Sequence, residues 1–83
     1  MNSQTMLDEA ELRELCADTL DVLPESLTDD AHFIDDLQVD SLIAMELAVS
    51  IQRRYGVVLS EQEIMSVRRF PDVYELLTRK LAA

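Results

Sequence analysis

The feature that most restricts the fold is an uninterrupted stretch, Leu42–Tyr55, which contains neither glycine nor proline. Its apolar residues recur at helical spacing, so the stretch predicts an amphipathic helix. Asp40 and Ser41 stand immediately before it, where a short polar side chain often caps the first turn. Gly56 follows it, as is common at the C-terminal end of a helix. The other segments of the chain have to pack against this helix.

Both faces of this helix carry apolar side chains. At ~100° per residue, one side collects a core stripe and the opposite side collects an outer strip. An amphipathic surface helix has no packing reason to place Leu and Val on its outer face. We therefore interpret the outer strip as a docking surface for a partner. The core stripe is Ala44, Leu47, Ala48, Ile51 and Tyr55, and the outer strip is Leu42, Glu46, Val49 and Arg53.

Three further helices are expected. The first runs from Leu7 to about Leu20, with Thr5 as its N-cap. A short one begins with the capping box Ser60–Glu63 and reaches about Ser66. The last begins at Phe70 with Pro71 in its first turn, where proline is tolerated. The side chains expected to face the core are Leu12, Leu15, Cys16 and Thr19 in the first helix and Val73, Leu76, Leu77 and Leu81 in the last.

The segment from 21 to 40 is a long connection in which Pro24–Leu27 is expected to form a short turn of helix. It holds too many apolar residues for a free loop, so we expect them to fix it to the helices: Val22, Leu23, Leu27, Phe33, Ile34 and Leu37. Val57–Leu59 is predicted to be a buried extended connector. The predicted fold is all-α, a four-helix bundle in one domain over residues 1–83, with a short third helix, a long first loop and residues 1–5 frayed.

The charge of the chain is strongly acidic and uneven. Its 17 acidic and 7 basic side chains give a net charge of −10, and residues 1–50 hold 13 of the acids with Arg13 as their only base. Such a surface repels nucleic acid and anionic membranes and attracts basic protein surfaces. No stretch approaches the ~20 apolar residues of a membrane span. The single cysteine, Cys16, is expected to be a buried apolar side chain and is consistent with a reducing cytoplasm.

No residue pattern indicates a metal site or an enzyme. Asp29, Asp30, Asp35 and Asp36 lack the spacing of a calcium loop, so no metal ligands are predicted. His32 is expected to be a surface or capping residue. The chain has no nucleophile paired with a base and no glycine-rich phosphate loop, so we expect it not to be an enzyme.

The motif Asp40-Ser41-Leu42, with Asp36-Leu37 before it and Glu46-Leu47 after it, resembles the attachment motif of acyl carrier proteins. The resemblance extends from about Leu7 to Leu81. It implies that Ser41 receives a 4′-phosphopantetheine arm from a phosphopantetheinyl transferase. The arm's thiol would then carry acyl groups as thioesters to acyltransferases and ketosynthases. We expect the protein to be cytoplasmic and monomeric.

Two departures from the family bear on function. Gln38 stands where the family usually has glycine, and glutamine accepts glycine's backbone angles less readily. Carriers of fatty-acid synthesis usually present an acidic second helix, whereas this one keeps Glu46 but also offers Ile43, Arg53 and Arg54. This favours a dedicated pathway, such as polyketide or other specialised acyl assembly. Asp36, Asp40, Leu42, Ile43, Glu46, Val49 and Arg53 are the expected partner-recognition residues.

Two alternatives stay open from sequence alone. One is a peptidyl or aminoacyl carrier, although a glycine-rich approach to the serine would then be expected. The other is an unmodified helical adaptor that binds partners through the outer strip, with Asp40 or Ser41 acting only as an N-cap.

Overall fold

The computed structural model describes residues 7–82, which form four α-helices and one 3₁₀ turn. In chain order these are α1 (Glu9–Leu20), η1 (Pro24–Ser26), α2 (Ser41–Tyr55), α3 (Glu61–Met65) and α4 (Phe70–Ala82). The predicted all-α fold, the short third helix and the long connection before the second helix are confirmed.

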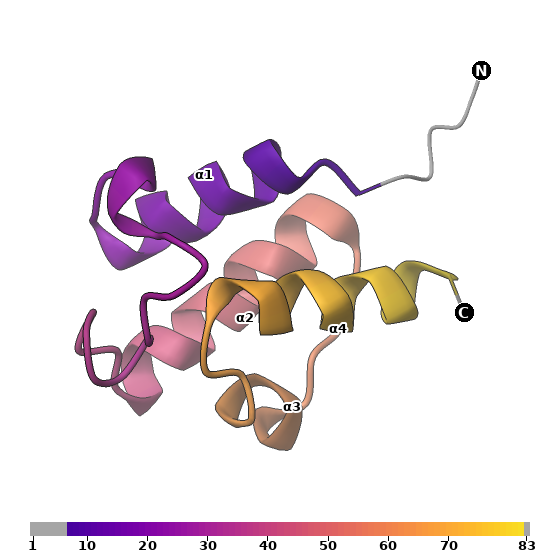
Figure 1. Cartoon of the computed structure of the whole chain (residues 1–83). Helices are drawn as coiled ribbons and strands as arrows, with labels where there is room; N and C mark the ends of the chain where they lie inside the picture. Colours follow the sequence, from indigo (N-terminus) through magenta and orange to yellow (C-terminus); the bar gives the residue numbers. More distant parts are fainter. Residues whose placement is uncertain (1–6, 83) are drawn as a thin grey trace.

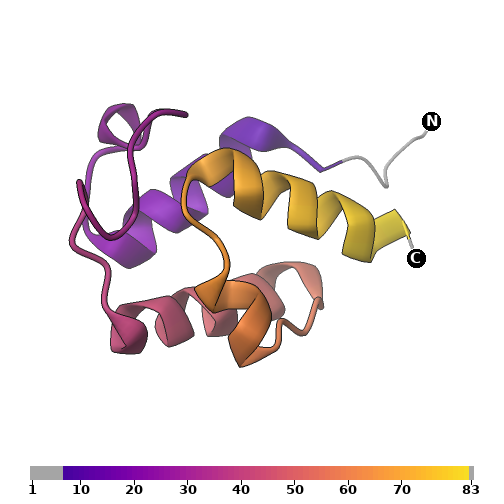
Figure 2. The same cartoon turned by 60° about the horizontal axis from the view of Figure 1, so that its bottom comes forward.

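The helices are arranged so that α1 runs in the opposite sense to α2 and α4 (Figures 1 and 2). Helix α1 contacts both α2 and α4, and the short α3 lies against α2. The connection from α1 to α2 occupies the end of the bundle at which α2 begins, on the left of Figure 1. This connection therefore determines how the start of α2 is presented.

The first helix starts later than the sequence suggested. It begins at Glu9, and Asp8 is its N-cap, with a carboxylate that accepts hydrogen bonds from the N–H groups of Ala10 and Glu11 at 3.0 and 3.3 Å. The predicted start at Leu7 is thus wrong by two residues, because an aspartate in extended conformation satisfies the first-turn donors better than leucine can. Thr5, the predicted cap, lies outside the described residues.

The other helix ends follow local sequence signals. Gly56 adopts a left-handed conformation (φ 71°) after α2, as is common for a glycine at this position. The capping box of α3 is present in both directions, with Ser60 and Glu63 exchanging hydrogen bonds. Helix α3 ends at Met65, one residue before the predicted end. The Glu63 carboxylate also pairs with Lys80 of α4 at 2.8 Å, and this hydrogen bond holds the pKa of Glu63 below its usual value.

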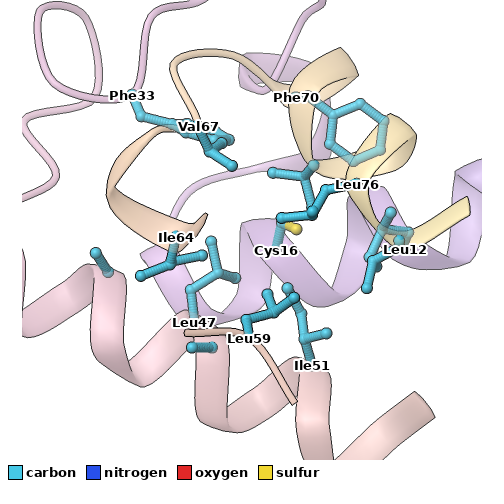
Figure 3. Close-up of a cluster of buried hydrophobic side chains, with 14 of the residues drawn as sticks. Leu12, Cys16, Phe33, Leu47, Ile51, Leu59, Ile64, Val67, Phe70 and Leu76 are labelled. Atoms are coloured by element: carbon cyan, nitrogen blue, oxygen red, sulfur yellow. The ribbon is translucent and has the colours of Figure 1, made fainter. Parts of the chain in front are cut away.

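A single hydrophobic core joins all the helices, and Figure 3 shows part of it. Helix α2 contributes the predicted stripe, with Tyr55 only partly buried. Cys16 is fully buried, as predicted, and burial raises the pKa of its thiol to about 12. No polar or charged side chain of residues 7–82 is buried. The buried set is Leu12, Cys16, Ala17, Leu27, Phe33, Ala44, Leu47, Ala48, Ile51, Val57, Leu59, Ile64, Val67, Phe70, Val73, Leu76 and Leu77.

The connections are fixed to this core by fewer residues than predicted. Leu27 and Phe33 are buried, and Val22 and Leu37 pack against the core, but Leu23 and Ile34 are exposed. Val57 and Leu59 of the second connector are buried as predicted, whereas Val58 between them points to water. Leu81 at the end of α4 is also exposed, because the last turn extends past the helices that it would pack against.

Arg13 links α1 to the long connection and to α4. Its guanidinium donates hydrogen bonds to the backbone oxygen of Leu27 and to the Asp29 carboxylate, the latter at 2.9 Å. It also lies over the ring of Phe70, 4.1 Å from the ring centre, a position favourable for a cation–π interaction. A third contact, at 3.0 Å, joins it to Glu9. One side chain thus holds three segments that are far apart in sequence.

Candidate functional site

The start of α2 is built from Asp40 and Ser41. Asp40 is the N-cap and its carboxylate accepts a hydrogen bond from the N–H of Ile43 at 2.9 Å, while its carbonyl accepts from Ala44. Ser41 is the first residue of the helix and is exposed. The N-cap role that the sequence gave to this pair therefore falls to Asp40. The hydroxyl of Ser41 makes no hydrogen bond to any described residue, so it remains available for chemistry.

The nine residues before Ser41 are held by hydrogen bonds of their own. The N–H of Phe33 donates to the carbonyl of Arg68, and the N–H of Val39 donates to the carbonyl of Phe33, both at 2.8 Å. The imidazole Nδ1 of His32 accepts from the N–H groups of Ile34 and Asp35, each at 3.2 Å. His32 thus acts as a capping residue, as predicted. The approach to Ser41 is an ordered turn and not a loose loop.

Gln38 adopts a left-handed conformation, with φ 56°. Its N–H donates to the carbonyl of Ile34 at 3.1 Å, which closes the turn before Val39. The sequence raised the question whether the turn would differ without glycine at this position. The structure shows glutamine taking the positive φ itself, at the steric cost that a Cβ atom brings there.

A pocket of about 140 Å³ opens next to Ser41, between the start of α2, the long connection and α3. Apart from Asp40 and Ser41, every side chain that lines it is apolar. Its lining residues are Phe33, Ile34, Val39, Asp40, Ser41, Ala44, Leu47, Ile64, Met65 and Val67. An apolar group attached near Ser41 would find a matching environment there.

The predicted outer strip of α2 is exposed: Leu42 keeps 69% and Val49 45% of its accessible surface, and Glu46 and Arg53 also face water. The strip also faces part of α1. It forms one wall of an open groove of about 490 Å³, and the end of α1 forms the other wall. The groove is lined by Asp18, Thr19, Leu42, Met45, Glu46, Val49, Ser50 and Arg53.

The remaining predicted recognition residues lie around this strip. Asp36 is exposed, but its carboxylate accepts the N–H of His32 at 2.7 Å and so also supports the turn. Ile43 is half-buried. Arg54, which the sequence grouped with Arg53, is paired with Glu11 of α1, so Arg53 is the arginine that the outer face presents.

Several residues at the site were missed or misplaced by sequence reasoning. Ile34 and Met65 line the pocket beside Ser41 while remaining 52% and 45% exposed. Met45 belongs to neither predicted face of α2, and it lies 38% exposed in the α1–α2 groove. Asp18 of α1 lines the same groove, and no sequence pattern indicated this position. For the groove, the sequence offered one signal, which was the apolar residues at helical spacing on the outer side of α2. Met45 could have been included among them.

Among residues 7–82, no three His, Cys, Asp or Glu side chains are grouped so that they could hold a metal ion. No helix in the same range combines the length and apolar character needed to cross a membrane.

Comparison with known proteins identifies one family. The family model described as "Phosphopantetheine attachment site" matches residues 10–77. Polyketide-8 synthase acyl carrier protein 2 of Streptomyces avermitilis is 51% identical over 77 residues, which are 93% of this chain and 88% of that protein. The acyl carrier protein of Thermosynechococcus vestitus is 31% identical over the full length of both chains. That of Petrotoga mobilis is 33% identical over 70 residues, 84% of this chain and 82% of the relative.

The left-handed Gln38 generates a stability prediction. Replacing Gln38 by glycine should raise the free energy of unfolding by about 0.5–1 kcal/mol, because the steric cost of a Cβ at positive φ exceeds the added freedom of the unfolded chain. Gln38→Ala is the matched control, since it removes the same side chain but keeps the Cβ. Urea denaturation measures both variants, and an alanine variant as stable as the glycine variant would refute this explanation.

Proposed function

Because the chain belongs to the family of acyl carrier proteins with a phosphopantetheine attachment site, we propose that Ser41 carries the 4′-phosphopantetheine arm. The observation that carries this assignment is the exposed Ser41 hydroxyl on the first residue of α2, directly after the capping Asp40. A phosphodiester formed there would lie at a helix N-terminus, where unpaired N–H groups and the helix dipole favour negative charge.

The other described serines support this choice by contrast. The hydroxyl of Ser50 accepts a hydrogen bond from Thr19, that of Ser60 caps α3, and that of Ser66 donates to the carbonyl of Glu63. Ser26 is exposed and makes no such bond to any described residue, but it lies in the 3₁₀ turn and not at the start of an α-helix.

The pocket beside Ser41 favours a carrier over an unmodified adaptor. Its volume of about 140 Å³ is close to that of a ~150 Å³ apolar cavity known to accept benzene. A short acyl group of about six carbons would therefore fit without moving the helices. An adaptor that binds only through the outer strip of α2 has no use for this space.

The pathway we propose is polyketide or other specialised acyl assembly. The relative with 51% identity is named as an acyl carrier protein of a polyketide synthase, whereas the relatives named only as acyl carrier proteins are 31% and 33% identical. Arg53 on the outer face of α2 agrees with this, because a basic residue there opposes enzymes suited to an all-acidic helix.

The partners we propose are a phosphopantetheinyl transferase, which loads the arm, and acyltransferases and ketosynthases, which use it. The carrier itself supplies no catalytic group, and we propose that it acts in the cytoplasm as a monomer. Recognition would combine steering by the acids Asp36, Asp40 and Glu46 with apolar contact through Leu42 and Val49. Ile43 and Arg53 would adjust the fit.

The attachment site is tested by loading. Purified apo-protein is incubated with coenzyme A and a promiscuous phosphopantetheinyl transferase, and the intact mass is measured. The wild type and Ser26→Ala should gain the mass of one arm, whereas Ser41→Ala should gain none while keeping its helical circular dichroism. An arm on folded Ser41→Ala would disprove the assignment, and an unmodified wild type would favour the adaptor.

Recognition by α2 is tested by acyl transfer from loaded protein to a panel of ketosynthases and acyltransferases. Glu46→Ala and Val49→Ala should impair transfer by enzymes of its own pathway about tenfold, equivalent to 1.4 kcal/mol, without unfolding. Arg53→Glu combined with Ile43→Asp should improve use by fatty-acid synthase enzymes. Arg79→Glu on α4 is the control for the change in charge. Equal rates for all these proteins would exclude α2 as the recognition surface.

A further inference from the structure

The groove between α1 and α2 has its two walls held together. The hydroxyl of Thr19 in α1 donates a hydrogen bond to the hydroxyl of Ser50 in α2, at 3.1 Å. Farther along the same pair of helices, Glu11 pairs with Arg54 and accepts a 3.5 Å hydrogen bond from Tyr55. Because these contacts tie α1 to α2 at two levels, the groove is present before any partner arrives.

The wall formed by α2 offers an apolar strip at helical spacing. Leu42, Met45 and Val49 are separated by three and four residues, so they lie on one face of the helix, and all three are exposed. Covering this exposed apolar surface with a partner lowers the free energy of the bound state. The strip begins directly after Ser41, so a partner seated on it would lie beside the attachment residue.

Charged side chains from both walls line the groove. Asp18 on α1 and Glu46 on α2 line the groove, and neither is in an ion pair with any residue between 7 and 82. Arg53, also outside those ion pairs, lines it seven residues beyond Glu46, which is about 10 Å along the helix axis. The groove therefore presents two negative groups, one from each wall, and one positive group on the α2 wall.

We propose that this groove, and not the outer face of α2 alone, is the docking surface for an acyl-processing enzyme, and that Asp18 of α1 is one of its specificity residues. The occupant is a surface segment of that enzyme with complementary charges. It carries a lysine or arginine that enters between Asp18 and Glu46, an apolar side chain over Leu42, Met45 and Val49, and an acidic residue that meets Arg53. The inference rests on the proposed carrier function.

The geometry explains why Asp18 matters although it lies outside α2. A cation placed between two carboxylates from opposite walls interacts with both, so its position is fixed across the groove as well as along it. A recognition surface confined to α2 would fix that position only along the helix. Asp18 thus selects among enzymes that all recognise an acidic, apolar helix.

The experiment compares Asp18→Lys with Glu14→Lys. Glu14 is an exposed acid on the same helix, one turn earlier, and it does not line the groove, so both variants change the net charge equally. Each protein is first loaded with the arm and its mass is checked. Acyl transfer to a panel of purified ketosynthases and acyltransferases from polyketide and fatty-acid synthases is then measured at low and high salt.

For the enzymes that use the wild type, Asp18→Lys should raise KM about tenfold at low salt with little change in kcat, and the effect should shrink as salt screens the charges. Asp18→Asn should give an intermediate rise, and Glu14→Lys should stay close to the wild type. Melting temperatures serve as the folding control.

Equal KM values for Asp18→Lys and Glu14→Lys with every enzyme would overturn the proposal, and so would inactivity of the loaded wild type with the whole panel. A failure of the carrier function itself is distinguishable, because it would appear earlier, as protein that does not gain the arm.

Discussion

The interactions of Arg13 hold the structure together at the point where sequence signals are weakest. The connection from α1 to α2 spans twenty residues, and only Leu27 and Phe33 among its side chains are fully inserted into the core. Arg13 satisfies the Leu27 carbonyl, pairs with Asp29 and packs over Phe70, so it fixes the connection to α1 and α4 together. Losing a partly buried hydrogen bond of this kind, which would leave a carbonyl unsatisfied, lowers the free energy of unfolding by about 1–3 kcal/mol.

This anchoring determines what the rest of the molecule can present. With the connection held at Leu27 and again at Phe33, the residues up to Asp40 close into a hydrogen-bonded turn, and α2 begins with an exposed Ser41. The same placement sets Phe33 and Ile34 against α3, which forms the pocket beside Ser41. Ser41, the apolar pocket beside it and the groove between α1 and α2 therefore all depend on the same end of the bundle.

Sequence predicted the features that depend on local interactions. The capping box at Ser60, the glycine end of α2 and the two faces of that helix follow from spacing and side-chain chemistry, so they could be foreseen. The positions of Ile34, Met65 and Asp18 depend on how distant segments approach one another, which periodicity does not encode. Gln38 is a different case. Its positive φ is imposed by the closed turn around it, against its own preference.

The structure implies that Arg13 keeps the approach to Ser41 ordered in the unliganded protein. Hydrogen exchange of the backbone amides in Arg13→Met, compared with the wild type, tests it most directly. The amides of Phe33 and Val39, which are hydrogen-bonded within the approach, should lose at least about tenfold more protection than the amide of Gly56 at the far end of α2. Unchanged protection at Phe33 and Val39, or an equal loss at all three amides, would contradict the claim.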